Sequence, residues 1–243
     1  GVDVGDGQRR AGRDRIVRRR RRNVRERRGV QDLLDSCALA RTHNAELAEL
    51  AQDSGSLNGK ILRLTPRQYR GAGGRPEVFS LGHRNPQGLA WQPKTQRLYS
   101  TEHGPSGFQG CCRDEVNYIE AGKNHGWPEI RGDEKKDGMV SPVIHAGTNE
   151  TWAPGGATFV TRGPWAGSLL FTGLRGQTLY RVVLDSNDPH KAEKLERYFY
   201  RQFGRLRDVV EAPDGHWYLL TSNRDGRGSP KDDDDQVIRL SFN

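Results

Sequence analysis

One pattern of short segments recurs from about residue 57 onward, and it constrains the fold more than any other feature of the chain. Each copy has a short segment after a Gly or an Arg, then a more apolar segment, then a segment in which apolar and polar residues alternate. The first segments are Gly88–Trp91, Gly156–Val160 and Leu206–Val210; the second are Arg97–Thr101, Ser168–Thr172 and Trp217–Thr221; the third are Asp114–Ile119, Thr178–Leu184 and Gln236–Leu240. Gly59–Leu64 resembles another third segment, and Glu77–Ser80 resembles a fourth, outer strand.

Short segments with a period of two, joined by turn residues, are typical of β-strands. The 30 Gly and 12 Pro agree with many tight turns. A unit of about 40–70 residues with three or four strands is what a propeller blade requires, whereas a β-sandwich has no reason to repeat strands in one order. We therefore predict an all-β propeller. Only three to four blades are visible, so we expect it to be incomplete at the N-terminal side.

The net charge of +8 is confined to the first residues of the chain. Residues 1–28 contain 12 Arg against four acidic residues, and acidic and basic residues balance in the remainder. The body of the chain therefore gives no electrostatic reason to bind nucleic acid.

The Arg-rich stretch itself allows three interpretations. It is a disordered arm that binds an anionic partner, a solvated leader without a role, or sequence that is not native, because a GC-rich gene read out of frame gives Arg-rich text. We predict residues 1–56 as a disordered or non-native leader, in which residues 31–52 allow a short helix, and residues 57–243 as the partial propeller.

Targeting signals and cysteines constrain the location and the chemistry of the chain only weakly. No run of about 18 apolar residues exists, so we expect no membrane insertion, and no signal peptide is visible. The adjacent Cys111 and Cys112 allow either a vicinal disulfide or two thiols. No Cys and His cluster has the spacing of a zinc site.

Three segments carry candidate ligand chemistry. Arg84 and Asn85 lie in a Pro-containing turn between two strands, where a propeller often binds ligands, although such a turn is also a common structural device. The Gly-Pro step in Thr101–Pro105 and the nearby carboxylates offer oxygen ligands to a hard cation such as Ca²⁺, but charged pairs are usually only solvated.

Arg205 and Arg207 form the third candidate. Residues i and i+2 of a strand point to the same face, and two guanidinium groups on one face repel each other unless an anion lies between them. That anion is either a polycarboxylate or phosphate ligand, or a local Asp or Glu.

Four phrases, GHRNPQGLAW, TEHGP, DEVNYIEAGKNHGWPEI and GRLRDVVEAPDG, occur together in this order. They resemble the soluble pyrroloquinoline quinone (PQQ)-dependent aldose sugar dehydrogenases of the glucose/sorbosone dehydrogenase family. The resemblance covers about residues 57–243, and nothing in residues 1–52 resembles the family. It implies a six-bladed propeller of the quinoprotein glucose dehydrogenase type, with PQQ and Ca²⁺ in its central channel.

The resemblance also implies roles for individual residues. Arg84 would be catalytic, stabilising charge at the reactive carbonyl of the cofactor, and Asn85 would hydrogen-bond the cofactor. Arg205 and Arg207 would face the cofactor, and Arg175 stands where some members place a cofactor-contacting Lys.

Two calcium sites follow from the same resemblance. Gly104 and Pro105 would offer backbone carbonyls to the Ca²⁺ of the cofactor. Glu115 and the backbone of His125 would bind a second, structural Ca²⁺.

The implied reaction oxidises the C1 hydroxyl of an aldose to a lactone and passes electrons to an external acceptor. The family's general base is a His before the GKILRL strand. No matching segment is visible here, and His43 has no motif around it, so we predict low or absent activity. The alternative is a non-catalytic propeller that binds glycans or proteins. The resemblance further implies a periplasmic or extracellular location and allows a homodimer.

Overall fold

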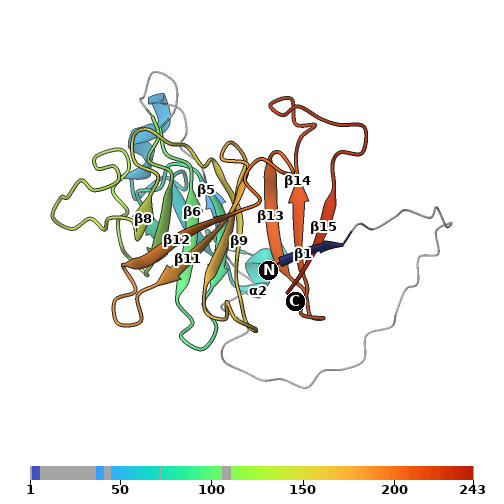
Figure 1. The fold of residues 1–243 in the computed structure, drawn as a ribbon. Coiled ribbons are helices and arrows are strands. Elements are labelled where there is room, and N and C mark those ends of the chain that lie inside the picture. Colours follow the sequence, from blue (N-terminus) through green and yellow to red (C-terminus); the bar gives the residue numbers. More distant parts are fainter. Residues whose placement is uncertain (1, 6–36, 41–44, 72, 106–110, 243) are drawn as a thin grey trace.

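The computed structural model of the chain describes residues 2–5, 37–40, 45–71, 73–105 and 111–242. Most of their regular structure is β-strand, arranged in four antiparallel sheets (Figure 1). The strands are β1 (Val2–Gly5), β2 (Cys37–Ala40), β3 (Lys60–Arg63), β4 (Glu77–Leu81), β5 (Pro86–Trp91), β6 (Leu98–Glu102), β7 (Glu115–Ile119), β8 (Ile144–His145), β9 (Pro154–Phe159), β10 (Leu169–Gly173), β11 (Thr178–Leu184), β12 (Ala192–Tyr198), β13 (Leu206–Glu211), β14 (Trp217–Thr221) and β15 (Val237–Phe242). Hydrogen-bonded neighbours follow the orders β2-β3-β4, β5-β6-β7-β8, β9-β10-β11-β12 and β13-β14-β15-β1.

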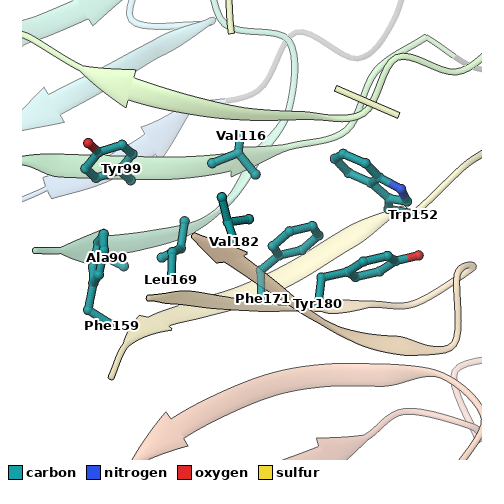
Figure 2. Close-up of a cluster of buried hydrophobic side chains, with 9 residues drawn as sticks. All are labelled: Ala90, Tyr99, Val116, Trp152, Phe159, Leu169, Phe171, Tyr180 and Val182. Atoms are coloured by element: carbon teal, nitrogen blue, oxygen red, sulfur yellow. The ribbon is translucent and has the colours of Figure 1, made fainter. Parts of the chain in front are cut away.

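Successive sheets pack against each other through three clusters of buried apolar side chains. The cluster between the β2–β4 and β5–β8 sheets contains Ile61, Leu98 and Ile119. The next cluster joins the β5–β8 and β9–β12 sheets, and in it the rings of Phe171 and Tyr180 stack with centroids 4.7 Å apart (Figure 2). The third joins the β9–β12 and β13–β15 sheets and contains Leu170, Leu206 and Leu219 among others. Sheets packed in sequence order in this way are blades, and the all-β propeller prediction is confirmed.

The repeat located the strands correctly. Its first segments correspond to β5, β9 and β13, its second to β6, β10 and β14, and its third to β7, β11 and β15. The outer strands β1, β8 and β12 were not predicted. The described residues form four sheets, and the count of six blades stays a prediction.

Glycines allow the first strands of the blades to approach one another closely. A Cβ added at Gly155 of β9 would overlap the carbonyl oxygen of Arg207 in β13, and one at Gly156 would overlap the carboxylate of Asp208. A Cβ at Gly88 of β5 would lie 2.8 Å from the carbonyl oxygen of Gly155. No larger residue fits at Gly88 or Gly155 without moving backbone, so these glycines keep β5, β9 and β13 in close contact.

Part of the predicted leader packs into the propeller. The 3₁₀ helix η1 (Ala45–Ala51) buries Ala48 and Ala51 against Trp127. The buried ammonium of Lys60 donates hydrogen bonds to three backbone carbonyls at and after the end of η1, at 2.8 to 3.0 Å. Burial lowers the pKa of Lys60, and the three acceptors compensate for its removal from water.

These contacts involve residues on the N-terminal side of residue 57, where we predicted that the propeller begins. Residues 45–56 contribute to the same packed unit as the residues after them. The prediction of a short helix within residues 31–52 is wrong at residues 37–40, because these residues form the strand β2. Residues 45–51 form the 3₁₀ helix η1. The Arg-rich stretch lies within residues 6–36, outside the described residues.

Helices are few and short among the described residues. The α-helix α2 (Pro66–Tyr69) begins with a capping box, in which the Thr65 side chain accepts from the backbone of Gln68 and the Gln68 side chain accepts from the backbone of Thr65. No helix in this part of the chain is long and apolar enough to cross a membrane.

Asp114, a buried carboxylate, ties the second blade to the third. Its Oδ1 accepts from the backbone N–H of Gly104 at 2.9 Å. Its Oδ2 accepts from the Thr151 hydroxyl at 2.9 Å and from the backbone N–H groups of Trp152 at 2.7 Å and Ala153 at 2.8 Å. Four donors from two loops therefore converge on one side chain.

We expect Asp114→Ala to lower the free energy of unfolding by about 3 kcal/mol or more, because it leaves buried N–H groups without an acceptor. Denaturation in urea measures the loss. The matched control is Asp137→Ala, which removes an exposed carboxylate and should change the stability by less than about 0.5 kcal/mol. A loss at Asp114 no larger than at Asp137 would contradict the role assigned to this carboxylate.

Candidate functional site

The strand register brings the ends of several loops to one edge of the blades. Antiparallel strands alternate in direction, so the loops before β5, β9 and β13 and the loops after β6, β10 and β14 leave their sheets at the same edge. The register pairs Pro86 with Glu102, Pro154 with Gly173, and Leu206 with Thr221. We call the edge marked by these six residues the site edge. The loops that hold Asn85, Gly104, Arg175 and Arg205 all lie there.

A buried carboxylate fixes the loop that carries Arg84 and Asn85. The Oε1 atom of Glu102 accepts hydrogen bonds from the backbone N–H groups of both residues, with 3.0 Å to Asn85. The Arg84 guanidinium donates to the carbonyl of His103 at 3.2 Å and lies 5.5 Å from the ring centroid of Trp127. Arg84 is only 5% exposed, and burial lowers the pKa of its guanidinium. Its position is therefore set by the fold.

A hydrogen-bonded chain extends from this carboxylate into the interior. Nδ1 of His83 lies 3.1 Å from Oε2 of Glu102, and Nε2 of His83 lies 2.8 Å from the hydroxyl oxygen of Ser80. Burial lowers the pKa of His83 to about 3, with a further contribution from the charge of Lys60, and burial raises the pKa of Glu102 to about 7. The imidazole is therefore neutral at pH 7, and with Glu102 ionised the tautomer that fits is the one that donates Nδ1–H to Glu102 and accepts from Ser80 at Nε2.

The first predicted calcium segment, Gly104 and Pro105, lies beside this series of hydrogen-bonded side chains. The backbone N–H of Gly104 donates to Asp114, and a Cβ at Gly104 would overlap the carbonyl oxygen of Cys112. Pro105 is buried. The sulfurs of Cys111 and Cys112 are joined as a vicinal disulfide, one of the two states that the sequence allowed.

The second predicted calcium segment contains Glu115, which faces Glu102 across the β6–β7 pair. Its carboxylate accepts from the backbone N–H of Gly132 at 3.1 Å and from the amide of Asn117 at 3.4 Å. Burial, with the nearby charge of Glu102, raises the pKa of Glu115 to about 8. This carboxylate therefore has two neutral donors and no cationic side chain bonded to it within the described part of the chain.

His125 contributes its ring to packing. The ring stacks on that of His83 with centroids 4.7 Å apart, and its two nitrogens have no hydrogen-bond partner among the described residues. Burial and the nearby charges of other histidines lower the pKa of His125 well below its usual value. The described residues contain no group of three or more His, Cys, Asp or Glu side chains suited to a metal, so a cation here would depend on backbone carbonyls.

Arg205 and Arg207 share one local carboxylate. Oδ2 of Asp225 accepts from Nη2 of Arg205 at 2.8 Å and from its Nε at 3.2 Å, and it lies 3.5 Å from Nη2 of Arg207. The register of β13 and β14 shifts between Leu206 and Asp208, and Arg207 lies at this irregularity. The anion between the two guanidinium groups is therefore Asp225, and of the two alternatives the local carboxylate is the one that this structure contains.

Arg175 stands apart from both groups. It is exposed in the turn between β10 and β11, and no hydrogen bond or ion pair engages its side chain among the described residues. The predicted site residues thus form one group with Arg84, Asn85, Gly104, Glu115 and His125, and a second with Arg205 and Arg207.

The start of β9 lies between the two groups. Nε2 of His103, the residue whose carbonyl binds Arg84, donates to the carbonyl of Pro154 at 2.8 Å. The next residue, Gly155, is in close contact with the backbone of Arg207. Burial lowers the pKa of His103, so its imidazole is neutral at pH 7. No residue is assigned as the general base, and His43 lies outside the described residues.

Sequence reasoning missed the side chains that hold the site. Glu102 and His103 lie in the TEHGP phrase, and Asp114 was interpreted as one of a carboxylate pair that either offers oxygen ligands to a cation or is solvated. Asp225 and Asn223 lie in a loop without any motif. The signal that identifies such residues is a short polar side chain next to a strand end, where backbone N–H groups need acceptors.

Comparison with known proteins decides the family. The family model described as Glucose / Sorbosone dehydrogenase matches residues 38–230. The chain belongs to this family. The match includes residues 38–52, so the prediction that nothing in residues 1–52 resembles the family is wrong there.

Individual relatives agree with the family match. The aldose sugar dehydrogenase YliI of Escherichia coli is 32% identical over 198 residues, which cover 72% of this chain and 51% of that protein. A solved oxidoreductase of Thermus thermophilus, described as a glucose dehydrogenase, has 46% identity and a TM-score of 0.72, covering 83% of this chain and 61% of that one. The PQQ-bound aldose sugar dehydrogenase of Streptomyces coelicolor has 38% identity and a TM-score of 0.67, covering 82% and 56%. The chain spans about half the length of the curated relatives it matches, 47% and 51% for two of them.

We expect Glu102→Ala to cost about 3 kcal/mol or more of unfolding free energy, because two backbone N–H groups and an imidazole N–H lose their acceptor. Ser80→Ala, which removes only the donor to Nε2 of His83, should cost about 1 kcal/mol. Urea denaturation measures both, with the exposed Glu193→Ala as the matched control. Equal effects of Glu102→Ala and Glu193→Ala would show that Glu102 does not hold the loop.

Proposed function

We propose that this chain is part of an aldose sugar dehydrogenase that binds PQQ and Ca²⁺ at the site edge and oxidises the C1 hydroxyl of an aldose to a lactone. The observation that carries the proposal is the common edge of the loops that hold Arg84, Asn85, Gly104 and Arg205. The family, and the PQQ bound to a relative with 38% identity, support the choice of cofactor. Electrons would pass to an external acceptor.

The arginines fit a flat, tricarboxylated ligand. Arg205 and Arg207 present two guanidinium groups to a single carboxylate oxygen of Asp225, so donor capacity remains for a second anion. Arg84 is held by the fold beside Asn85 and would direct positive charge at the oxygen that gains electrons. Arg175 is exposed and would reach the cofactor from the β10–β11 turn. When bound, PQQ supplies the acceptor for the hydride of the sugar.

The oxygen atoms near the site suit a hard cation. The carbonyls of Gly104 and Pro105 would hold the Ca²⁺ of the cofactor, and Glu115 with the carbonyl of His125 would hold the second. The donor set supports this, because Glu115 lacks a bonded cationic side chain among the described residues and Ca²⁺ prefers carboxylate and carbonyl oxygens. Ca²⁺ at the first site would raise the electrophilicity of the quinone.

The reaction also requires a group that removes the C1 hydroxyl proton. Before the Gly59–Leu64 segment this sequence contains His43, but no segment there matches the family's His-containing motif. We therefore propose that the chain binds the cofactor and turns over slowly or not at all. A periplasmic or extracellular location is part of the same proposal.

Cofactor binding is tested by titrating PQQ into the protein with Ca²⁺ and following the quinone absorbance. We expect a saturable spectral change, weakened about tenfold or more by Arg207→Gln, because the variant removes a charge-assisted contact and leaves Arg205 in place. Arg67→Gln, on the distant helix α2, is the matched control and should bind as the unmodified chain does. No spectral change would favour the alternative, a non-catalytic propeller that binds glycans or proteins.

Turnover is tested by dye reduction with aldoses in the presence of PQQ and Ca²⁺. We expect a rate at least about 100-fold below that of a relative with the complete set of residues, since general-base catalysis contributes on the order of 10²- to 10⁴-fold. Robust turnover by this chain would refute the proposal that the base is missing.

A further inference from the structure

A pocket of about 430 Å³ opens at the site edge beside the Arg205 group. Its walls are Gln177 after β10, residues 201–205 after β12, and part of the loop from Asn223 to Gln236 between β14 and β15. The volume lies in the range of about 300–1,000 Å³ that is usual for small-molecule sites. It was not among the sites predicted from the sequence.

The back wall of the pocket is fixed by Asn223, which is 4% exposed. Its Oδ1 accepts from the backbone N–H of Arg205 at 2.8 Å. Its amide nitrogen donates to the carbonyl of Phe203 at 3.0 Å and to Oδ1 of Asp234 at 2.9 Å. The buried amide of Asn223 thus fixes the position of the loop before β13 relative to the loop between β14 and β15.

The charge in the pocket is positive. The side chains of Arg201, Arg227 and Lys231 are exposed, and none forms an ion pair with a carboxylate in the described ranges. The lining carboxylates, Asp233 and Asp234, each accept hydrogen bonds from donors of their own loop. The lining carries four cationic side chains against two carboxylates, and this excess of positive charge on a concave surface favours an anionic ligand.

The uncharged lining adds a second preference. Gln177 and Gln202 bring amides to the pocket, and Ser229 brings a hydroxyl, whereas the amide nitrogen of Gln236 donates to Asp233. Amides donate and accept, as the hydroxyl groups of a sugar do. A pocket for inorganic phosphate alone would need neither the amides nor the volume.

We propose that this pocket binds a monosaccharide that carries an anionic group, a phosphate or a carboxylate. The amides hold the hydroxyl groups, and Arg227 and Lys231 hold the anion. As a statement about the substrate class of the enzyme, the inference rests on the proposed function, because Arg205 lines the pocket and belongs to the candidate cofactor group. As a statement about binding, it stands on the pocket alone.

The experiment is isothermal titration calorimetry of the chain at low ionic strength, without PQQ, using glucose 6-phosphate, glucuronate, glucose and inorganic phosphate. We expect one of the two anionic sugars, or both, to bind at least about tenfold more tightly than either glucose or inorganic phosphate. The phosphate and carboxylate arms identify the anion. The double variant Arg227→Gln/Lys231→Gln should weaken this binding about tenfold or more, and Gln177→Ala should weaken it to a smaller degree.

Arg67→Gln removes one charge far from the pocket and should leave the affinity unchanged. Three results would each overturn the inference. In the first, glucose binds as tightly as both anionic sugars; in the second, inorganic phosphate does. In the third, the double variant leaves the binding of the anionic sugars unchanged. Arg227 and Lys231 are outside the candidate cofactor group. A failed PQQ titration with intact sugar binding would therefore refute the proposed function and leave the pocket, whereas the reverse result would refute only the pocket.

Discussion

The architecture of the site depends on how backbone N–H groups are satisfied where strands end. At the site edge the sheet ladders stop, and loop N–H groups that turn inward need acceptors. Three buried side chains supply them: Glu102 for Arg84 and Asn85, Asp114 for Gly104, and Asn223 for Arg205. These predicted cofactor and metal loops are therefore each fixed by a polar side chain from a neighbouring segment. Arg175, which is exposed, is the exception.

This arrangement explains what the sequence could and could not predict. The central strands of each blade followed from the local pattern: the apolar second strands β6 and β10 are buried at every position, and the third strands alternate. The outer strands were missed for a local reason: β12 reads AEKLERY, a polar edge, and β8 has only two residues. The acceptors were missed because they act at long range. Asp114 binds the backbone 38 residues away, and Asp225 binds Arg205 20 residues away, separations that no short motif reports.

The electrostatics of the two site groups differ because their burial differs. In the Arg84 group, carboxylates and imidazoles lie beneath the surface, where desolvation disfavours charge, so His83 is neutral and Glu102 has a pKa raised to about 7. In the Arg205 group, Asp225 remains ionised between two guanidinium groups, and its pKa is lowered chiefly by its hydrogen bond from Arg205. In the first group the buried Glu102 and neutral His83 set the geometry of the loop that carries the Arg84 guanidinium. The second group has an excess of positive charge, because the guanidinium groups of Arg205 and Arg207 share the single carboxylate of Asp225.

The distance between these groups is set by glycine. Gly155 lies between the segment that holds Arg84 and the backbone of Arg207, and Gly156 makes room for Asp208. A side chain at Gly155 would meet the backbone of Arg207 and push β9 away from β13, and one at Gly156 would displace the carboxylate of Asp208. Arginine–carboxylate contacts are lost within about 1 Å of displacement, since hydrogen bonds weaken steeply beyond about 3.2 Å. The close approach of the first strands thus sets the spacing between the segment that holds Arg84 and the backbone of Arg207.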